Sequence, residues 1–167
     1  MKAYKHVLVA ILFLLGAGVL TQITIKGNFI HFVWITFLLF FLFNSIVRSK
    51  ISFKPYFLSK WNFFSAKYRK DIEFDIPIEL VFDKLLEVFS EKPFKLRYAN
   101  KDTFEIFSTT GYSWKSWGEN IYIQLVMLDD NTIIKFNSVS LFGIYTRGKN
   151  EENFEGVLQK IEDSLTV

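Results

Sequence analysis

Two uncharged apolar stretches near the N-terminus constrain this chain more than any other feature. Residues 7–25 and 29–47 each run for 19 residues without a charged side chain. At about 1.5 Å of helical rise per residue, each would extend about 28 Å, close to the roughly 30 Å of a bilayer's hydrocarbon core. A Lys-Gly-Asn tripeptide separates them with a charge and two turn-forming residues. The sequence therefore predicts a transmembrane hairpin of two helices within residues 1–47.

The distribution of positive charge favours one orientation of this hairpin. Lys2 and Lys5 precede the first stretch, seven basic residues follow the second within residues 48–70, and only Lys26 lies between them. The positive-inside rule then places the N and C termini in the cytoplasm of a bacterial-type cell, as an integral protein of the inner membrane. Alternatively, the first stretch is a signal peptide, and the second stretch alone is the anchor. The C-terminal part is cytoplasmic under both interpretations.

Residues 48–70 are predicted to form a basic and aromatic collar at the membrane surface. They contain seven basic and seven aromatic residues and no acidic one. Beyond Pro55, apolar residues between Phe57 and Tyr68 share one helical stripe, which is typical of an amphipathic helix lying in the interface. Such a composition also suits single-stranded nucleic acid. We expect the anionic inner leaflet as partner and no nucleic acid, because the leaflet is the nearest polyanion. The candidate interface residues here are Lys60, Trp61, Phe64 and Lys67.

Residues 71–167 are predicted to fold by themselves as a cytoplasmic α+β domain. They contain all 17 acidic residues but only ten basic ones. The apolar pattern predicts the order β-α-β-β-β-β-α, an antiparallel sheet covered on one face by two helices. Strands are expected over 71–76, 94–99, 103–110, 120–128 and 132–141, with one helix between Pro77 and Pro93 and another from an Asn150 N-cap to Leu165.

The opening of this domain resembles that of START-like helix-grip domains. The resemblance is carried by Ile72, Phe74, Asp75, Ile76 and Pro77, by the helical pattern that follows through Leu85, and by the amphipathic helix after the sheet. It implies that the first strand pairs with the last, and that an apolar ligand is held between the sheet and the C-terminal helix. Only five strands are visible, and the additional helices that help to roof the family's cavity are missing. Residues 117–120 and 148–153 also resemble segments of uncharacterised membrane-anchored bacterial proteins.

The residue types that carry most catalytic chemistry are missing from the predicted domain. The chain has no Cys, and its two histidines, His6 and His31, belong to the predicted membrane part. Neither a P-loop nor a G-x-G-x-x-G motif occurs. Asp71, Glu73 and Asp75 alternate along one strand face, as expected of a solvated surface. We therefore expect no enzyme, and no catalytic, cofactor-binding or metal site.

Aromatic and basic residues concentrate in two loops that the predicted sheet brings to one edge. Residues 111–118 precede the strand at 120–128, and residues 143–149 follow the strand at 132–141. Because these strands are antiparallel neighbours, the start of one lies beside the end of the other. The candidate residues for contact with membrane or partner are Trp114, Lys115, Trp117, Tyr145, Arg147 and Lys149. The alternative is that the two tryptophans pack into the rim of the domain's own core.

These features together predict a membrane-anchored, non-catalytic interaction or accessory module. Its expected partners are the lipid bilayer and a membrane protein. The alternative is an apolar-ligand or lipid-binding protein that uses a cavity between the sheet and the C-terminal helix. A filled core favours the interaction module, whereas an apolar pocket of about 300 Å³ or more favours the ligand binder.

Overall fold

The computed structural model describes residues 16, 18, 29–129 and 131–165, and the chain divides into two compact units at the bond between Val47 and Arg48. In the first unit, α2 (Phe29–Val47) is helical as predicted. Its residues Ile30–Val47 are long and apolar enough to cross a membrane, with a mean hydropathy of 2.1. The other predicted span, residues 7–25, lies outside the described residues except for Gly16 and Gly18. The two-helix hairpin therefore stays a prediction.

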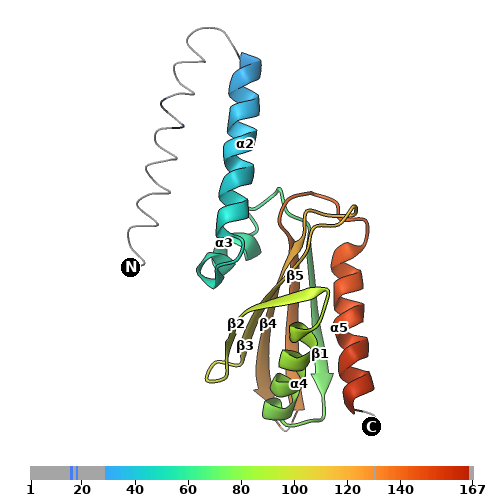
Figure 1. Ribbon diagram of the computed structural model, residues 1–167. Helices are drawn as coiled ribbons and strands as arrows, with labels where there is room; N and C mark the ends of the chain where they lie inside the picture. Colours follow the sequence, from blue (N-terminus) through green and yellow to red (C-terminus); the bar gives the residue numbers. More distant parts are fainter. Residues whose placement is uncertain (1–15, 17, 19–28, 130, 166–167) are drawn as a thin grey trace. The chain divides into compact units, whose positions relative to one another are not determined.

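The second unit contains one five-stranded antiparallel sheet in the order β1-β5-β4-β3-β2 (Figure 1). The α+β class and the five strands predicted from the sequence are confirmed. The first strand pairs with the last, as the family resemblance implies, with Ile72 opposite Ile134. The strands are β1 (Lys67–Phe74), β2 (Phe94–Asn100), β3 (Glu105–Thr110), β4 (Glu119–Leu128) and β5 (Asn131–Ser140).

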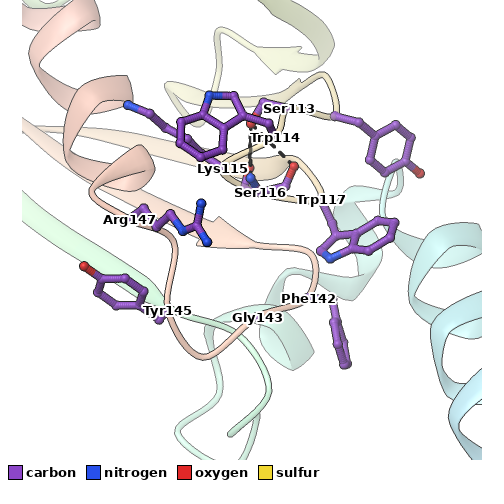
Figure 2. Close-up of a pocket in the computed structure, with 10 residues that line it drawn as sticks. Ser113, Trp114, Lys115, Ser116, Trp117, Phe142, Gly143, Tyr145 and Arg147 are labelled. Carbon is purple, nitrogen blue, oxygen red and sulfur yellow. Dashed lines mark hydrogen bonds between the residues drawn. The ribbon is translucent and has the colours of Figure 1, made fainter.

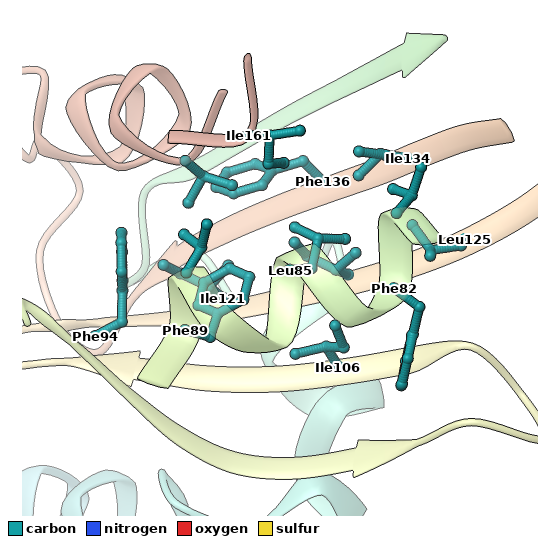
Figure 3. Packing of buried hydrophobic residues seen from close by; sticks show 14 of the residues in the cluster. Phe82, Leu85, Phe89, Phe94, Ile106, Ile121, Leu125, Ile134, Phe136 and Ile161 are labelled. Atoms are coloured by element: carbon teal, nitrogen blue, oxygen red, sulfur yellow. The ribbon is translucent and has the colours of Figure 1, made fainter. Parts of the chain in front are cut away.

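Two helices, α4 (Ile78–Ser90) and α5 (Lys149–Leu165), bury their apolar stripes against one face of this sheet (Figure 3). The alternation of side chains along a strand sends every second residue to this face. Aromatic rings pack against one another between the sheet and the helices. The ring centroids of Phe136 and Phe154 are 5.3 Å apart, and those of Phe89 and Phe94 are 5.1 Å apart. The helices and strands thus share one continuous apolar core, whose buried members are Ile78, Val81, Phe82, Leu85, Val88, Phe89, Phe94, Ile106, Ile121, Ile123, Leu125, Ile134, Phe136, Phe154, Val157 and Ile161.

The opposite face of the sheet is contacted by the segment that follows the apolar helix. This segment contains a short 3-10 helix, η1 (Ile51–Phe53), and the short helix α3 (Lys54–Leu58). The ammonium group of Lys54 pairs with the carboxylate of Glu105 on β3. From β1, Arg69 donates a hydrogen bond of 2.7 Å to the carbonyl oxygen of Leu58. The predicted collar is therefore part of the folded domain.

The amphipathic helix predicted between Phe57 and Tyr68 is wrong. Helix α3 ends at Leu58, and β1 begins at Lys67, four residues before the predicted strand. The edge of β5 explains the difference, because its backbone groups between residues 136 and 139 find partners in residues 67–70. Phe57 is completely buried and does not face a membrane interface.

The predicted N-cap role of Asn150 is also wrong. Helix α5 begins one residue earlier, and the side chain of Asn150 is buried. Its amide oxygen accepts a hydrogen bond of 2.7 Å from the Ser138 hydroxyl, and its nitrogen donates one of 3.2 Å to the carbonyl oxygen of Ala66. Asn150 therefore ties the start of α5 to β5 and to the residues before β1.

The contacts of the 48–70 segment predict which fragment of the chain folds. A fragment of residues 48–167 should unfold cooperatively in urea. A fragment of residues 71–167 should be less stable by at least about 2 kcal/mol, because it lacks the buried Phe57 and half of β1. Far-ultraviolet circular dichroism during urea titration measures both free energies of unfolding. Equal values would show that residues 48–70 contribute nothing to the domain.

Candidate functional site at one end of the sheet

Three segments meet where β4 begins and β5 ends. Glu119, the first residue of β4, pairs with Ser140, the last residue of β5, so the loops before and after them leave the sheet together. The segment before β1 joins them through two backbone hydrogen bonds. The amide of Gly143 donates to the carbonyl oxygen of Phe64 at 2.8 Å, and the amide of Ala66 donates to the carbonyl oxygen of Gly143 at 2.8 Å. We call the residues 64–66, 111–118 and 141–148 the loop end. The structure thus brings the two predicted loops to one edge.

Large aromatic side chains are exposed at the loop end. Trp114 is 80% exposed, Tyr145 is 79% exposed and Trp117 is 52% exposed. The two tryptophans therefore do not pack into the rim of the core. The rings of Tyr112 and Trp117 meet edge to face, with a centroid distance of 6.4 Å. Tyr112 was not predicted as a site residue, because nothing in its spacing distinguishes it from the rest of the loop.

A groove of about 370 Å³ lies between the two loops (Figure 2). Trp114 and Arg147 lie on one side of it, and Trp117 and Phe142 lie on the other. Phe142 was not predicted, and its ring stacks on that of Phe64 with a centroid distance of 6.4 Å. The groove therefore combines a cationic side with an aromatic side.

The positive charges near the groove differ in their partners. The guanidinium carbon of Arg147 is 5.1 Å from the centroid of the Trp114 ring, a cation–π contact. Lys115 and Lys149 both pair with the carboxylate of Glu152. The hydrogen bond from Lys115 is the main reason why the pKa of Glu152 lies below its ordinary value. Both lysines thus share one carboxylate, so the three groups together retain one positive charge.

A buried glutamate holds the first loop in place. The side chain of Glu119 is completely buried, and its carboxylate accepts hydrogen bonds from the hydroxyls of Ser116 and Thr110. The same carboxylate accepts a hydrogen bond of 3.1 Å from the side-chain amide of Asn153 on α5. Because a buried carboxylate needs such donors, these contacts fix the loop to both β3 and α5.

Arg48, the first residue of the domain, is bound in the same region. Its guanidinium is largely buried and donates to the carbonyl oxygens of Trp117, at 3.3 Å, and of Thr110. Removal from water lowers the pKa of Arg48. Gly118 has a left-handed φ of 90°, and a Cβ there would collide with this guanidinium. Arg48 is one of the seven basic residues of the predicted collar, but in the structure its side chain is buried within the domain.

The ten predicted interface residues have different surroundings. The loops at the loop end contain Trp114, Lys115, Trp117, Tyr145 and Arg147, with Lys149 directly after them and Phe64 reaching them through Phe142. Trp61 is exposed, and the Lys60 ammonium lies 6.0 Å from its ring centroid. Lys67 differs from these residues, because its ammonium donates to the carbonyl oxygens of Ser59 and Asn62 at 2.5 Å and 3.0 Å. Lys67 therefore stabilises its own segment.

Within the part of the chain that the structure describes, no group of three His, Asp or Glu side chains is placed to hold a metal ion.

No family model matches the sequence, and no curated protein matches it.

Solved structures do match part of the chain. The crystal structure of Ara h 8.0201 matches with 10% identity and a TM-score of 0.48, over 61% of this chain and 98% of that one. The crystal structure of TTHA0849 from Thermus thermophilus matches with 10% identity and a TM-score of 0.40, over 58% of this chain and 94% of that one. The strand order and the helix packing described above define the fold of this domain independently of these matches.

The network around Glu119 predicts a large effect of a small change. Glu119→Ala should lower the free energy of unfolding of residues 48–167 by at least about 2 kcal/mol, because it leaves buried donors on Ser116, Thr110 and Asn153 without an acceptor. Glu87→Ala, at an exposed position of α4, is the matched control and should have little effect. Urea denaturation followed by circular dichroism compares them. Equal losses for the two variants would contradict the assigned role of Glu119.

Proposed function

We propose that this protein is a membrane-anchored, non-catalytic interaction or accessory module that holds its loop end against the anionic inner leaflet. The observation that carries the proposal is the gathering of exposed Trp114, Trp117 and Tyr145 with Arg147 at a single edge of the domain. Tryptophan and tyrosine rings are amphipathic and prefer the level of the lipid headgroups. Arginine beside them suits a negatively charged surface.

Chain connectivity supports this orientation. Helix α2 ends at Val47, and the next residue, Arg48, is bound within the loop end. A helix that crosses the bilayer and ends at Val47 would deliver Arg48 to the cytoplasmic surface. The proposed orientation needs no additional linker, because the chain enters the domain at the edge that carries the exposed aromatic residues.

The charge of the domain favours the same orientation. Residues 71–167 contain 17 acidic and ten basic residues, so an anionic leaflet should repel most of their surface. Arg147, in contrast, is exposed at the loop end. Turning the loop end toward the lipid would bring this cation close to the leaflet and keep the acidic surface away. A membrane-protein partner could bind the same aromatic surface.

The alternative function is binding of an apolar ligand or lipid between the sheet and α5. The pairing of the first and last strands, which the helix-grip resemblance implies, supports it. The packing of Phe136 against Phe154 and of Tyr68 against Phe154 favours the interaction module, because these rings occupy the space that such a ligand would need.

Quenching of tryptophan fluorescence by brominated lipids tests the proposed orientation. The full chain, with Trp34 and Trp61 replaced by Phe, retains Trp114 and Trp117 as its only tryptophans. In vesicles we expect strong quenching by bromines near the headgroups, since both rings should lie at that level. A reporter fused after residue 167 serves as the control for a cytoplasmic C-terminus. The absence of quenching at every bromine depth would contradict the proposal.

A further inference from the structure

We propose that the groove at the loop end binds the headgroup of a single anionic phospholipid, with Arg147 contacting the phosphate. This inference rests on the proposed function and adds a ligand class to it. The volume of about 370 Å³ is in the range of small-molecule sites. A planar guanidinium can donate two parallel hydrogen bonds to a phosphate, which makes arginine well suited to this contact.

The contacts of the cations near the groove point to Arg147 as the one available to a ligand. Lys115 and Lys149, two other cations near the groove, share the carboxylate of Glu152, and the guanidinium of Arg48 donates to backbone carbonyl oxygens. Arg147 instead lies over the ring of Trp114, which leaves its N–H edge able to donate to a phosphate. A cation over an aromatic ring retains its positive charge, so this side of the groove attracts anions.

The backbone of the second loop holds Arg147 in an uncommon conformation. Its φ is 48°, in the left-handed region that is unfavourable for a residue with a side chain. The neighbouring residues keep it there: the amide of Lys149 donates to the carbonyl oxygen of Thr146 at 2.9 Å, and the buried Asn150 donates to the Thr146 hydroxyl at 3.4 Å. The tertiary structure thus maintains a strained turn that directs Arg147 toward Trp114 (Figure 2).

The other side of the groove suits the less polar part of the same ligand. Trp117 and Phe142 line it with aromatic surface. A phospholipid at the membrane surface has a charged phosphate next to a glycerol backbone and acyl chains. A groove with a cation on one side and aromatic rings on the other matches both parts. The membrane that α2 is proposed to span is the nearest source of such a molecule.

Lipid competition in native mass spectrometry tests this inference. The full chain in detergent micelles is given equal amounts of phosphatidylglycerol and phosphatidylcholine with the same acyl chains. We expect preferential retention of one phosphatidylglycerol molecule, and Arg147→Gln should reduce this preference about tenfold, as expected for loss of a hydrogen bond to a charged group. Lys101→Gln removes one exposed charge from the turn after β2, away from the groove, and is the matched control.

A second variant tests the role of charge by removing a negative group instead of a positive one. Glu152→Gln removes the carboxylate that pairs with Lys115 and Lys149 and raises the positive charge near the groove by one, so it should increase the retention of phosphatidylglycerol. Excess inorganic phosphate distinguishes the lipid from a free phosphate, and we expect it not to displace the lipid. Equal retention of both lipids, an Arg147→Gln variant that behaves as Lys101→Gln does, or complete displacement by phosphate would each overturn the inference. Quenching by brominated lipids that persists beside equal retention would leave the membrane contact standing and remove only the headgroup site.

Discussion

The burial of one arginine at the edge of the sheet is the interaction on which the loop end depends. Arg48 donates to the carbonyl oxygens of Thr110 and Trp117, and its guanidinium carbon lies 5.4 Å from the centroid of the Tyr112 ring. A buried cation without such acceptors would be costly, so these contacts compensate for the water that it loses. The buried carboxylate of Glu119 adds favourable charge nearby. Together they hold residues 110–119 in the conformation that exposes the two tryptophans.

The apolar core of the domain and its proposed binding surface lie in different places. Its apolar core lies between the sheet and the helices α4 and α5, whereas the groove and the exposed aromatic residues lie at the loop end. The polar network of Glu119 and Asn153 connects the two, because it joins the first loop to α5. The proposed binding at the groove would therefore require no opening of the core. This arrangement fits a module that presents a rigid surface better than one that encloses a ligand.

Regular patterns made much of the domain predictable. The alternation along 71–76 and the stripe from Ile78 to Phe89 each reflect burial of one face, and the structure confirms both elements. The helix predicted from the 57–68 stripe is wrong because the apolar residues of the stripe belong to different elements. Phe57 is a buried residue of α3, whereas Tyr68 belongs to β1 and packs on Phe154. Periodicity alone cannot distinguish one amphipathic helix from two short elements joined by a turn.

The location of the candidate site could be predicted from the sequence, but the residues that hold its loops in place could not. Antiparallel pairing places the two loops together, so Trp114 and Arg147 could be expected at one edge. The roles of Arg48 and Asn150 depend on tertiary contacts across most of the domain, which composition and spacing do not contain. Gly118 was the available signal for Arg48, because a glycine beside a bulky loop residue can mark a close approach.

Site-directed spin labelling tests the central claim, that the loop end lies against the membrane. The chain has no native cysteine, so Tyr145→Cys and Met127→Cys each place one label at an exposed position, at the loop end and at the end of β4 respectively. In proteoliposomes of the full chain, the label at 145 should be more accessible to oxygen, which partitions into lipid, than to an aqueous nickel chelate. The label at 127 should show the reverse. Greater accessibility of both labels to the nickel chelate would contradict the account.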